Sequence, residues 1–167
     1  MNRPIRLLCV TLALVPSLAR AQARQGLGSG DSGLVLTLDA GGGTALGAGS
    51  HYTPSGRGEF ELTGGFELPY EIRPEVALVI GVAPNGHVGV RPGVHVGLPE
   101  TPLYVRAALD WSDLSGSGRW NWLLGGLGGE LRLTGALGAF AEADLGIPIR
   151  SDVGLGVLVR AGISVRL

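Results

Sequence analysis

The C-terminal part of the chain alternates apolar residues with polar or small ones at a period of two. Between positions 153 and 167, eight apolar residues share one parity, and the other parity carries glycine, serine and arginine at most positions. At an apolar frequency of 45%, eight such residues in a row arise by chance about 0.002 times per trial. Successive side chains of a β-strand point to opposite faces, so this pattern predicts a strand with one apolar and one polar face.

The same period recurs through the rest of the chain, between glycine, proline or polar breaks. The segment 137–147 places Glu142 and Asp144 on one face and no charged residue on the other. Five further segments alternate in the same way, at 34–40, 59–68, 87–98, 103–111 and 123–133. The segment 75–83 is apolar on both parities. We therefore predict eight strands, with the facing of 75–83 unassigned.

The connections between these segments are short. Asn85-Gly86 and Thr134-Gly135 are typical of tight hairpin turns, prolines bound the connections at 69–74 and 99–102, and the longest connection runs over 41–58. None has room for a crossover helix. Each strand is therefore expected to pair antiparallel with the next, in one domain of up-and-down order.

Residues 1–23 have the three parts of a secretory signal peptide. Arg3 and Arg6 precede a short apolar stretch, and small residues follow it. The apolar stretch is too short to cross a bilayer as a helix. We expect cleavage after position 23, with cleavage after Ala21 as the alternative, and a β-barrel domain at 24–167. An amphipathic first helix is the other interpretation of this segment.

Composition and charge exclude several classes of protein. A chain that is 45% apolar and 16% charged, with 30 glycines in no triplet period, is neither disordered nor collagen-like. A formal net charge of −1, with no run of like charge, gives no electrostatic footprint for nucleic acid. Cys9 is the one cysteine and lies in the predicted signal peptide, so no disulfide framework is expected.

The direction in which the apolar face points decides between two kinds of barrel. A soluble barrel or sandwich turns its apolar face inward, whereas a membrane barrel turns it toward lipid and keeps a polar lumen. Glycine is dense on the polar parity, which leaves space for a few large ionic side chains in a narrow interior. The last strand reaches Leu167 and can close the sheet, as lipid requires. The sequence thus predicts an all-β, antiparallel, up-and-down, eight-stranded transmembrane β-barrel.

Charges of both signs lie on the polar parity and can pair with one another inside such a barrel. This parity includes Asp39, Glu67, Arg91 and Asp110. From it we predict a lumen charge network that fills the barrel, formed by Glu59, Glu61, Arg106, Glu130, Arg132, Glu142, Asp144, Arg160 and Arg166. Glutamates opposite arginines are more often a salt-bridged filling than a cation site.

Over its whole mature length, and most clearly at 137–147 and 153–167, this pattern resembles the small eight-stranded outer-membrane β-barrels of Gram-negative bacteria, of the OmpX and OmpA-transmembrane-domain type. The resemblance implies insertion into the outer membrane with both chain ends on the periplasmic side. It also implies that the connections 41–58, 84–86, 112–119 and 150–152 face outward. The chain departs from the family by ending in Leu167 rather than an aromatic residue. Trp111, Trp120 and Trp122 are expected to mark one membrane interface, with Phe60, Phe66 and Tyr70 contributing.

Candidate chemistry is sparse. His51, His87 and His95 lack the spacing of metal ligands. A serine hydrolase would need Ser112, Ser115 or Ser117 beside Asp113 and a histidine, and no spacing supports that arrangement. The glycine-rich run at 125–129 lies within a predicted strand and lacks the lysine and helix of a phosphate loop. We predict no catalytic, cofactor-binding or metal-binding residue.

These observations predict a non-enzymatic, monomeric outer-membrane barrel with a structural or surface-interaction role. The expected partners are outer-membrane lipid and the outer-membrane assembly machinery, with no nucleic acid. Two alternatives from other classes remain: a soluble periplasmic or secreted lipocalin-like barrel that binds an apolar ligand, and a lipid-modifying outer-membrane enzyme.

Overall fold

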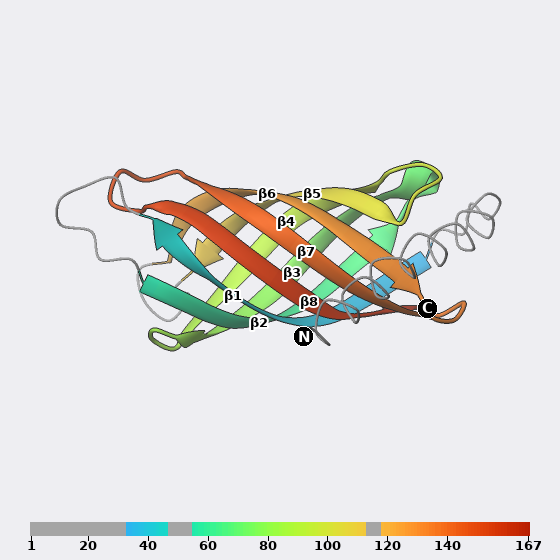
Figure 1. Cartoon of the computed structure of the whole chain (residues 1–167), viewed down its shortest axis with the longest axis horizontal. Coiled ribbons are helices and arrows are strands. Elements are labelled where there is room, and N and C mark those ends of the chain that lie inside the picture. The colour runs from blue at the N-terminus through green and yellow to red at the C-terminus, as the bar shows by residue number, and fades with distance from the viewer. Residues whose placement is uncertain (1–32, 47–54, 113–117) are drawn as a thin grey trace, which may run out of the picture.

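The computed structural model describes residues 33–46, 55–112 and 118–167, which form a barrel of strands (Figure 1). Within these ranges, eight strands and one short 3-10 helix follow one another: β1 (Gly33–Leu46), β2 (Ser55–Glu67), η1 (Pro69–Glu71), β3 (Ile72–Ala83), β4 (His87–Gly97), β5 (Leu103–Ser112), β6 (Arg119–Arg132), β7 (Leu137–Pro148) and β8 (Leu155–Arg166). The predicted signal peptide at 1–23 lies outside the described residues.

The sheet closes on itself. Each strand pairs antiparallel with the next, and β8 pairs with β1 between Val35 opposite Arg166 and Leu46 opposite Leu155. This confirms the predicted antiparallel order of eight strands. The barrel has a distal end, which carries the connections at 84–86 and 149–154, and a terminal end, where β1 begins and β8 ends. The distal end lies at the left of Figure 1.

The register of the strands sets the width and tilt of the barrel. Directly paired residues can be followed from strand to strand around the sheet, through Val35, Gly65, Glu75, Gly93, Ala108, Leu124, Gly146, Gly156 and Ala45. The circuit begins and ends in β1 but returns ten residues further along it. For eight strands, this stagger corresponds to a tilt of about 40° and an interior just wide enough for side chains.

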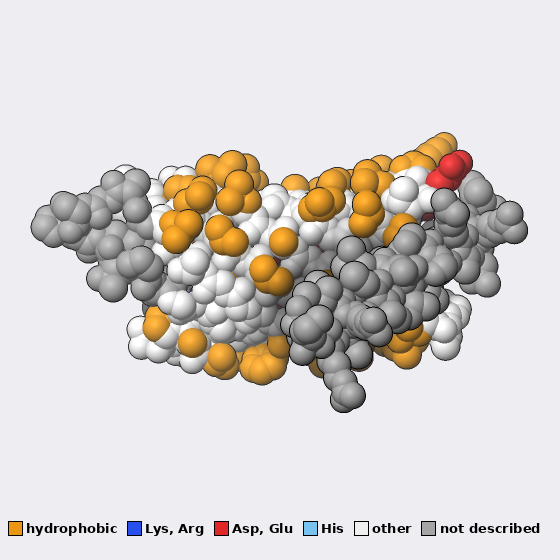
Figure 2. Space-filling view, in the orientation of Figure 1, with side chains coloured by type: hydrophobic (Ala, Val, Ile, Leu, Met, Phe, Trp, Pro, Cys, Tyr) orange, Lys and Arg blue, Asp and Glu red, His pale blue; other side chains and the backbone are white. Residues whose placement is uncertain are grey.

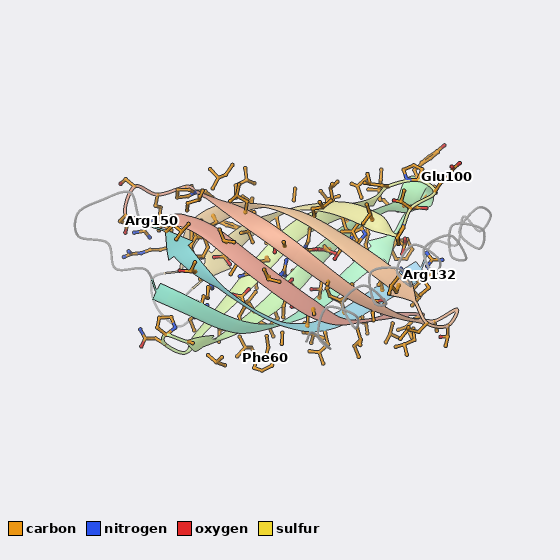
Figure 3. All side chains as sticks on the ribbon, in the orientation of Figure 1. Phe60, Glu100, Arg132 and Arg150 are labelled. Atoms are coloured by element: carbon orange, nitrogen blue, oxygen red, sulfur yellow. The ribbon has the colours of Figure 1, made fainter. Side chains whose placement is uncertain are left out.

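Apolar side chains face outward and charged side chains face inward. In β8, Val159 is 58% exposed and the next residue, Arg160, is 2% exposed. Phe60 points away from the barrel (Figure 3), and the coloured side chains on the visible wall are hydrophobic, with acidic atoms at one end only (Figure 2). This confirms the predicted facing of the strands that alternate.

Two expectations about the strands need correction. The connection expected at 41–58 is shorter, because β1 and β2 stay paired as far as Ala45 opposite Ser55. The glycines at 41–43 lie in a strand and not in a loop. They allow close packing of β1 on β8, because a Cβ at Gly43 would overlap the carbonyl oxygen of Val157. Likewise β3 begins at Ile72, inside the connection expected at 69–74.

The burial pattern of β3 shows which of its two faces points into the barrel. Its odd-numbered residues point inward, so the strand contributes Arg73 and Glu75 to the interior before it becomes apolar on both sides. The inward Ala77 and Val79 are fully buried, whereas Val76 and Leu78 on the other face are exposed. The apolar character of both parities thus reflects a small apolar section of the barrel interior.

Candidate functional site

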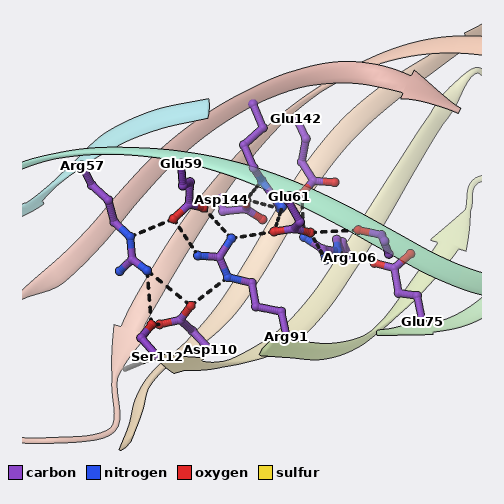
Figure 4. A network of polar contacts seen from close by, with 12 residues as sticks. Arg57, Glu59, Glu61, Glu75, Arg91, Arg106, Asp110, Ser112, Glu142 and Asp144 are labelled. Atoms are coloured by element: carbon purple, nitrogen blue, oxygen red, sulfur yellow. Dashed lines mark hydrogen bonds and ion pairs between the residues drawn. The ribbon is translucent and has the colours of Figure 1, made fainter. Parts of the chain in front are cut away.

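Arg91 in β4 lies at the centre of the charged interior and is 0% exposed. Its Nη1 and Nη2 donate to the two carboxylate oxygens of Glu59, at 2.5 and 2.9 Å, and Nη1 also donates to Glu61 Oε2 at 2.6 Å. Its Nε donates to Asp110 Oδ1 at 2.8 Å. Because these acids come from β2 and β5, a single guanidinium connects three strands through charge-assisted hydrogen bonds (Figure 4).

Glu61 in β2 joins Arg91 to two further arginines. Arg106 Nη2 in β5 lies 2.8 Å from Glu61 Oε1, and Arg160 Nη1 in β8 lies 2.6 Å from Oε2. A carboxylate has enough lone pairs to accept from all three guanidiniums. Glu61 therefore links the network across the lumen, from β4 and β5 to β8.

The outer contacts of Arg106 and Arg160 extend the network to β3 and β7. Arg106 Nε donates to Glu75 Oε1 at 2.5 Å. Arg160 Nη2 donates to Glu142 and, at 2.6 Å, to Asp144 Oδ2. The contacts of Arg160 with β7 follow from the strand register, because Arg160 is paired directly with Glu142 in the antiparallel ladder.

A smaller cluster lies at the terminal end of the lumen. Arg166 Nη1 donates to Glu130 Oε1 at 2.7 Å, and Arg166 Nε lies 3.5 Å from Glu67 Oε2. Arg73 Nη2 lies 2.7 Å from His95 Nδ1. Since an arginine can only donate, Nδ1 of His95 is the acceptor and the ring is neutral with its proton on Nε2.

The structure places the predicted network residues in three positions. Six lie in the central network: Glu59, Glu61, Arg106, Glu142, Asp144 and Arg160. Glu130 and Arg166 pair at the terminal end. Arg132 is the last residue of β6 and is exposed where the barrel wall ends (Figure 3).

Five further interior residues belong to the same contacts: Arg57, Arg73, Glu75, Arg91 and Asp110. Arg91 and Asp110 are on the polar parity of the sequence but were not among the predicted network. Their importance depends on which strands face each other across the lumen. A sequence pattern within one strand does not contain that information.

Glycines on the inward face make room for the ionic side chains. A Cβ at Gly126 would overlap Asp144 Oδ1, and a Cβ at Gly41 would overlap the side chain of Arg160. On the outward face the neighbouring Gly125 has no heavy atom within 4 Å of such a Cβ. The inward glycines are therefore part of the packing of the charged interior.

Carboxylates outnumber guanidiniums in the described interior. The acids are Asp39, Glu59, Glu61, Glu67, Glu75, Asp110, Glu130, Glu142 and Asp144, and the arginines are Arg57, Arg73, Arg91, Arg106, Arg160 and Arg166. Asp39 makes no ion pair with any described residue, and its Oδ1 is buried without a hydrogen-bond partner there. It lines a cavity of about 20 Å³, which has room for one water molecule.

Arg57 in β2 organises the distal end of the lumen. Its Nε donates to Glu59 Oε2 at 2.8 Å, and its Nη2 lies 3.0 Å from His87 Nε2 and 3.3 Å from Ser112 Oγ. Its guanidinium carbon lies 4.7 Å from the centre of the Trp122 ring, a cation–π distance. Arg57 thus joins the central network to an aromatic wall.

The position of Trp122 differs from the expectation that it marks a membrane interface on the outside of the barrel. It is buried inside the barrel, where its Nε1 donates to the carbonyl oxygen of Gly154 at 2.8 Å. The register of β5 and β6 shifts between Asp110 and Trp111, so Trp120 pairs with Trp111 while Trp122 pairs with Asp110. Trp120 is exposed and its ring stacks on Trp111 at 5.3 Å. A β-bulge therefore turns two tryptophans of the same parity in opposite directions.

A serine, a histidine and an aspartate meet near Arg57, but not in a hydrolase arrangement. Ser112 Oγ donates to Asp110 Oδ2 at 2.8 Å, and His87 Nε2 accepts from Arg57. The imidazole thus has no proton-accepting nitrogen directed at Ser112. His51, Asp113, Ser115 and Ser117 lie outside the described residues.

Two further features of the described ranges concern metal sites and membrane-spanning helices. Within them, no group of three or more histidine, cysteine, aspartate or glutamate residues is arranged to hold a metal ion. Within the same ranges, no helix has the length and apolar character needed to cross a membrane.

Comparison with known proteins finds a likeness at the level of the fold. No family model and no curated protein matches the chain. A solved structure reported as "De novo design of transmembrane beta-barrels" has a TM-score of 0.52 and 15% sequence identity, and the match covers 82% of this chain and 98% of that one. At this identity the likeness supports the closed antiparallel barrel and says nothing about individual residues.

Proposed function

We propose that this protein is a bacterial outer-membrane β-barrel, of the small OmpX and OmpA-transmembrane-domain type, with a filled lumen and a non-enzymatic structural or surface-interaction role. The observation that carries the proposal is the inverted distribution of side chains. Leucine, valine, isoleucine and phenylalanine cover the outside of the described barrel while arginine and carboxylate pairs fill the inside. In water, so large an exposed apolar surface would drive association, whereas lipid solvates it.

The dimensions of the strands support the proposal. They are 10 to 14 residues long. At a tilt of about 40° such strands rise about 25 to 35 Å along the barrel axis, and a hydrocarbon core is about 30 Å thick. The similar solved structure is itself described as a transmembrane β-barrel design.

The lipocalin-like alternative requires an apolar interior that holds an apolar ligand. The described interior is instead crossed by ion pairs around Arg91 and Glu61, and the cavity beside them is only about 20 Å³. Filling by charged side chains favours a structural lumen and disfavours that alternative. For the lipid-modifying enzyme, no described serine contacts a histidine base, and we propose that the protein has no such activity.

Expression of the full chain in a Gram-negative host, followed by fractionation, tests this proposal. We expect the mature chain, cleaved near position 23, in the outer-membrane fraction, extracted by detergent but not by salt or alkaline carbonate. We expect it to be a monomer that depends on lipid and on the outer-membrane assembly machinery to insert. Recovery as a folded soluble periplasmic protein would overturn the proposal, and lipid hydrolysis or acyl transfer by the purified barrel would overturn its non-enzymatic part.

A further inference from the structure

A small cavity of about 20 Å³ lies between the central network and the terminal end of the lumen. Its lining includes Thr37 and Asp39 of β1 and Thr63 of β2. In the antiparallel ladder Thr37 lies opposite Thr63, and Asp39 lies opposite Glu61. All four side chains are buried in the interior, and directly paired residues have Cβ atoms about 4.5 to 5.5 Å apart. A pair of hydroxyls therefore lies next to a pair of carboxylates.

Only one carboxylate of this pair is compensated by the described arginines. Glu61 contacts Arg91, Arg106 and Arg160. Asp39 is only 4% exposed, yet it makes no ion pair with any described residue, and its Oδ1 has no hydrogen-bond partner there. Like charges at directly paired positions repel, and an isolated buried carboxylate is costly. Asp39 therefore needs compensation by a proton or by a bound cation.

The arginines that line the cavity are bound to other partners. Arg106 uses its Nε, Nη1 and Nη2 atoms to contact three carboxylates, among them Glu61 (Figure 4). Arg73 Nε donates to Glu75 Oε2 at 3.2 Å, and its Nη2 lies 2.7 Å from His95 Nδ1. Neither guanidinium is thus directed at Asp39.

The surroundings of Asp39 offer oxygen ligands to a small cation. Thr63 Oγ1 donates its proton to Glu61 Oε1 at 3.2 Å, which leaves the lone pairs of this hydroxyl free to bind a cation. Thr37 is two residues from Asp39 on the same face of β1. On β8 the position paired with Asp39 is Gly162, so no side chain covers the carboxylate from there. Carboxylate and hydroxyl oxygens are the ligands that hard cations prefer.

The size of the cavity and the number of carboxylates favour a monovalent ion. A volume of about 20 Å³ holds one occupant of the size of a water molecule, and a sodium ion is of similar size. A calcium ion takes about six to eight oxygen ligands, with several carboxylates among them. The described part of the chain has no group of three or more such side chains arranged around a metal. One positive charge is also all that Asp39 lacks.

We propose that a sodium ion occupies this cavity, bound by the carboxylate of Asp39 and the hydroxyl oxygens of Thr37 and Thr63. The sequence gave no expectation of a metal-binding residue, because the pairing of β1 with β2 brings these ligands together. The proposal goes beyond the outer-membrane role and does not rest on it, so either can fail while the other stands. By compensating Asp39, the ion stabilises the folded barrel.

Thermal unfolding of the purified full-length barrel in an uncharged detergent tests the proposal. Sodium chloride is compared with choline chloride at equal concentration, because choline is too large for the cavity while the screening by salt is the same. A ligand that binds only the folded state at about 100 times its dissociation constant raises the unfolding temperature by about 5 to 10 °C. We expect such a rise with sodium and none with choline. Equal unfolding temperatures in the two salts would overturn the proposal. An unfolding temperature that depends on pH but not on sodium would assign the compensation to a proton and would overturn it too.

Three variants assign the sodium effect to the cavity. Asp39→Asn removes the charge, so the difference between the two salts should disappear. Thr37→Val removes one hydroxyl and keeps the shape of the side chain, so the difference should fall at least twofold. Asp152→Asn removes an exposed carboxylate at the distal end and should keep the full difference.

The measured quantity is a difference between two salts, so a change in basal stability does not affect it. If Asp39→Asn fails to fold, Thr37→Val decides alone. An unchanged difference in Asp39→Asn or in Thr37→Val, or an equal loss in Asp152→Asn, would contradict the proposed site.

Discussion

Glu142 of β7 and Arg160 of β8 occupy directly paired positions of the ladder, and their side chains form an ion pair inside the barrel. Asp144, two residues along β7 on the same face, also contacts the guanidinium of Arg160. Local pairing between neighbouring strands is thereby connected, through Glu61, to a network that crosses the lumen. The positions of the interior ion pairs therefore depend on the register of the strands as well as on the signs of the charges.

Removal of Arg160 should destabilise the barrel strongly. Arg160→Ala leaves Glu61, Glu142 and Asp144 facing one another with less compensation, and loss of one partner from a buried pair costs about 3 to 5 kcal/mol. Thermal unfolding in detergent should therefore occur at a clearly lower temperature. Adding Glu142→Gln to Arg160→Ala should restore part of the loss.

Arg150, which is partly exposed and pairs with the exposed Asp152 in the connection between β7 and β8, provides the matched control. Arg150→Ala should barely move the unfolding transition, because exposed pairs contribute little. If Arg160→Ala unfolds as the unaltered protein does, the interior pairs are not structural.

Gly125 and Gly126 are adjacent in β6 and lie on opposite faces of the barrel wall, so the same substitution at each tests the two faces separately. Gly126→Val should destabilise the barrel, because its side chain would overlap Asp144 and press on Glu142, and overpacking costs about 1 to 3 kcal/mol. Gly125→Val points into open space and should be tolerated. Denaturant unfolding of the two variants side by side measures the difference, and equal effects would argue against this facing of β6.

The lumen should not conduct as an open pore. Arg91, Glu59, Glu61 and Asp110 are fully buried across its middle, and an eight-stranded barrel has an interior about as wide as its own side chains. Planar-bilayer recordings of the purified monomer should therefore show no stable, large conductance. A steady pore-like current would mean that this filling opens in the membrane.

Much of the fold was predictable because one simple rule governs it. The alternation of Val159 with Arg160, and of the residues around Glu142, predicts both the strands and their facing, because successive side chains of a strand lie on opposite sides of the barrel wall and the two sides differ in chemistry. The inward position of Arg73 was not predicted, because the neighbouring Pro74 resembles a turn signal. In the structure the strand continues through Pro74, with Arg73 and Glu75 pointing inward on either side of it.

The arrangement of the site was less predictable, for physical reasons. Arg91 is central because the narrow, closed barrel brings its side chain to acids of the neighbouring β5 and of β2, two strands away, which is a property of closure and stagger and not of any one strand. Trp122 turns inward because a bulge interrupts the alternation after Trp120. Neither effect leaves a mark on the hydrophobic period that first revealed the strands.

The most direct test of the central claim, that lipid covers the barrel, compares the same substitution at two equally exposed positions. Val159 on β8 and Leu133 beyond the end of β6 are 58% and 60% exposed, but only Val159 lies within a strand of the barrel wall. In a bilayer, arginine costs about 2 to 4 kcal/mol near the midplane and about 0 to 1 kcal/mol near the interface. Urea titration of folding into phospholipid vesicles should therefore show a large loss of folding free energy for Val159→Arg and a small one for Leu133→Arg. Equal, small losses at both positions would contradict a lipid-facing barrel wall.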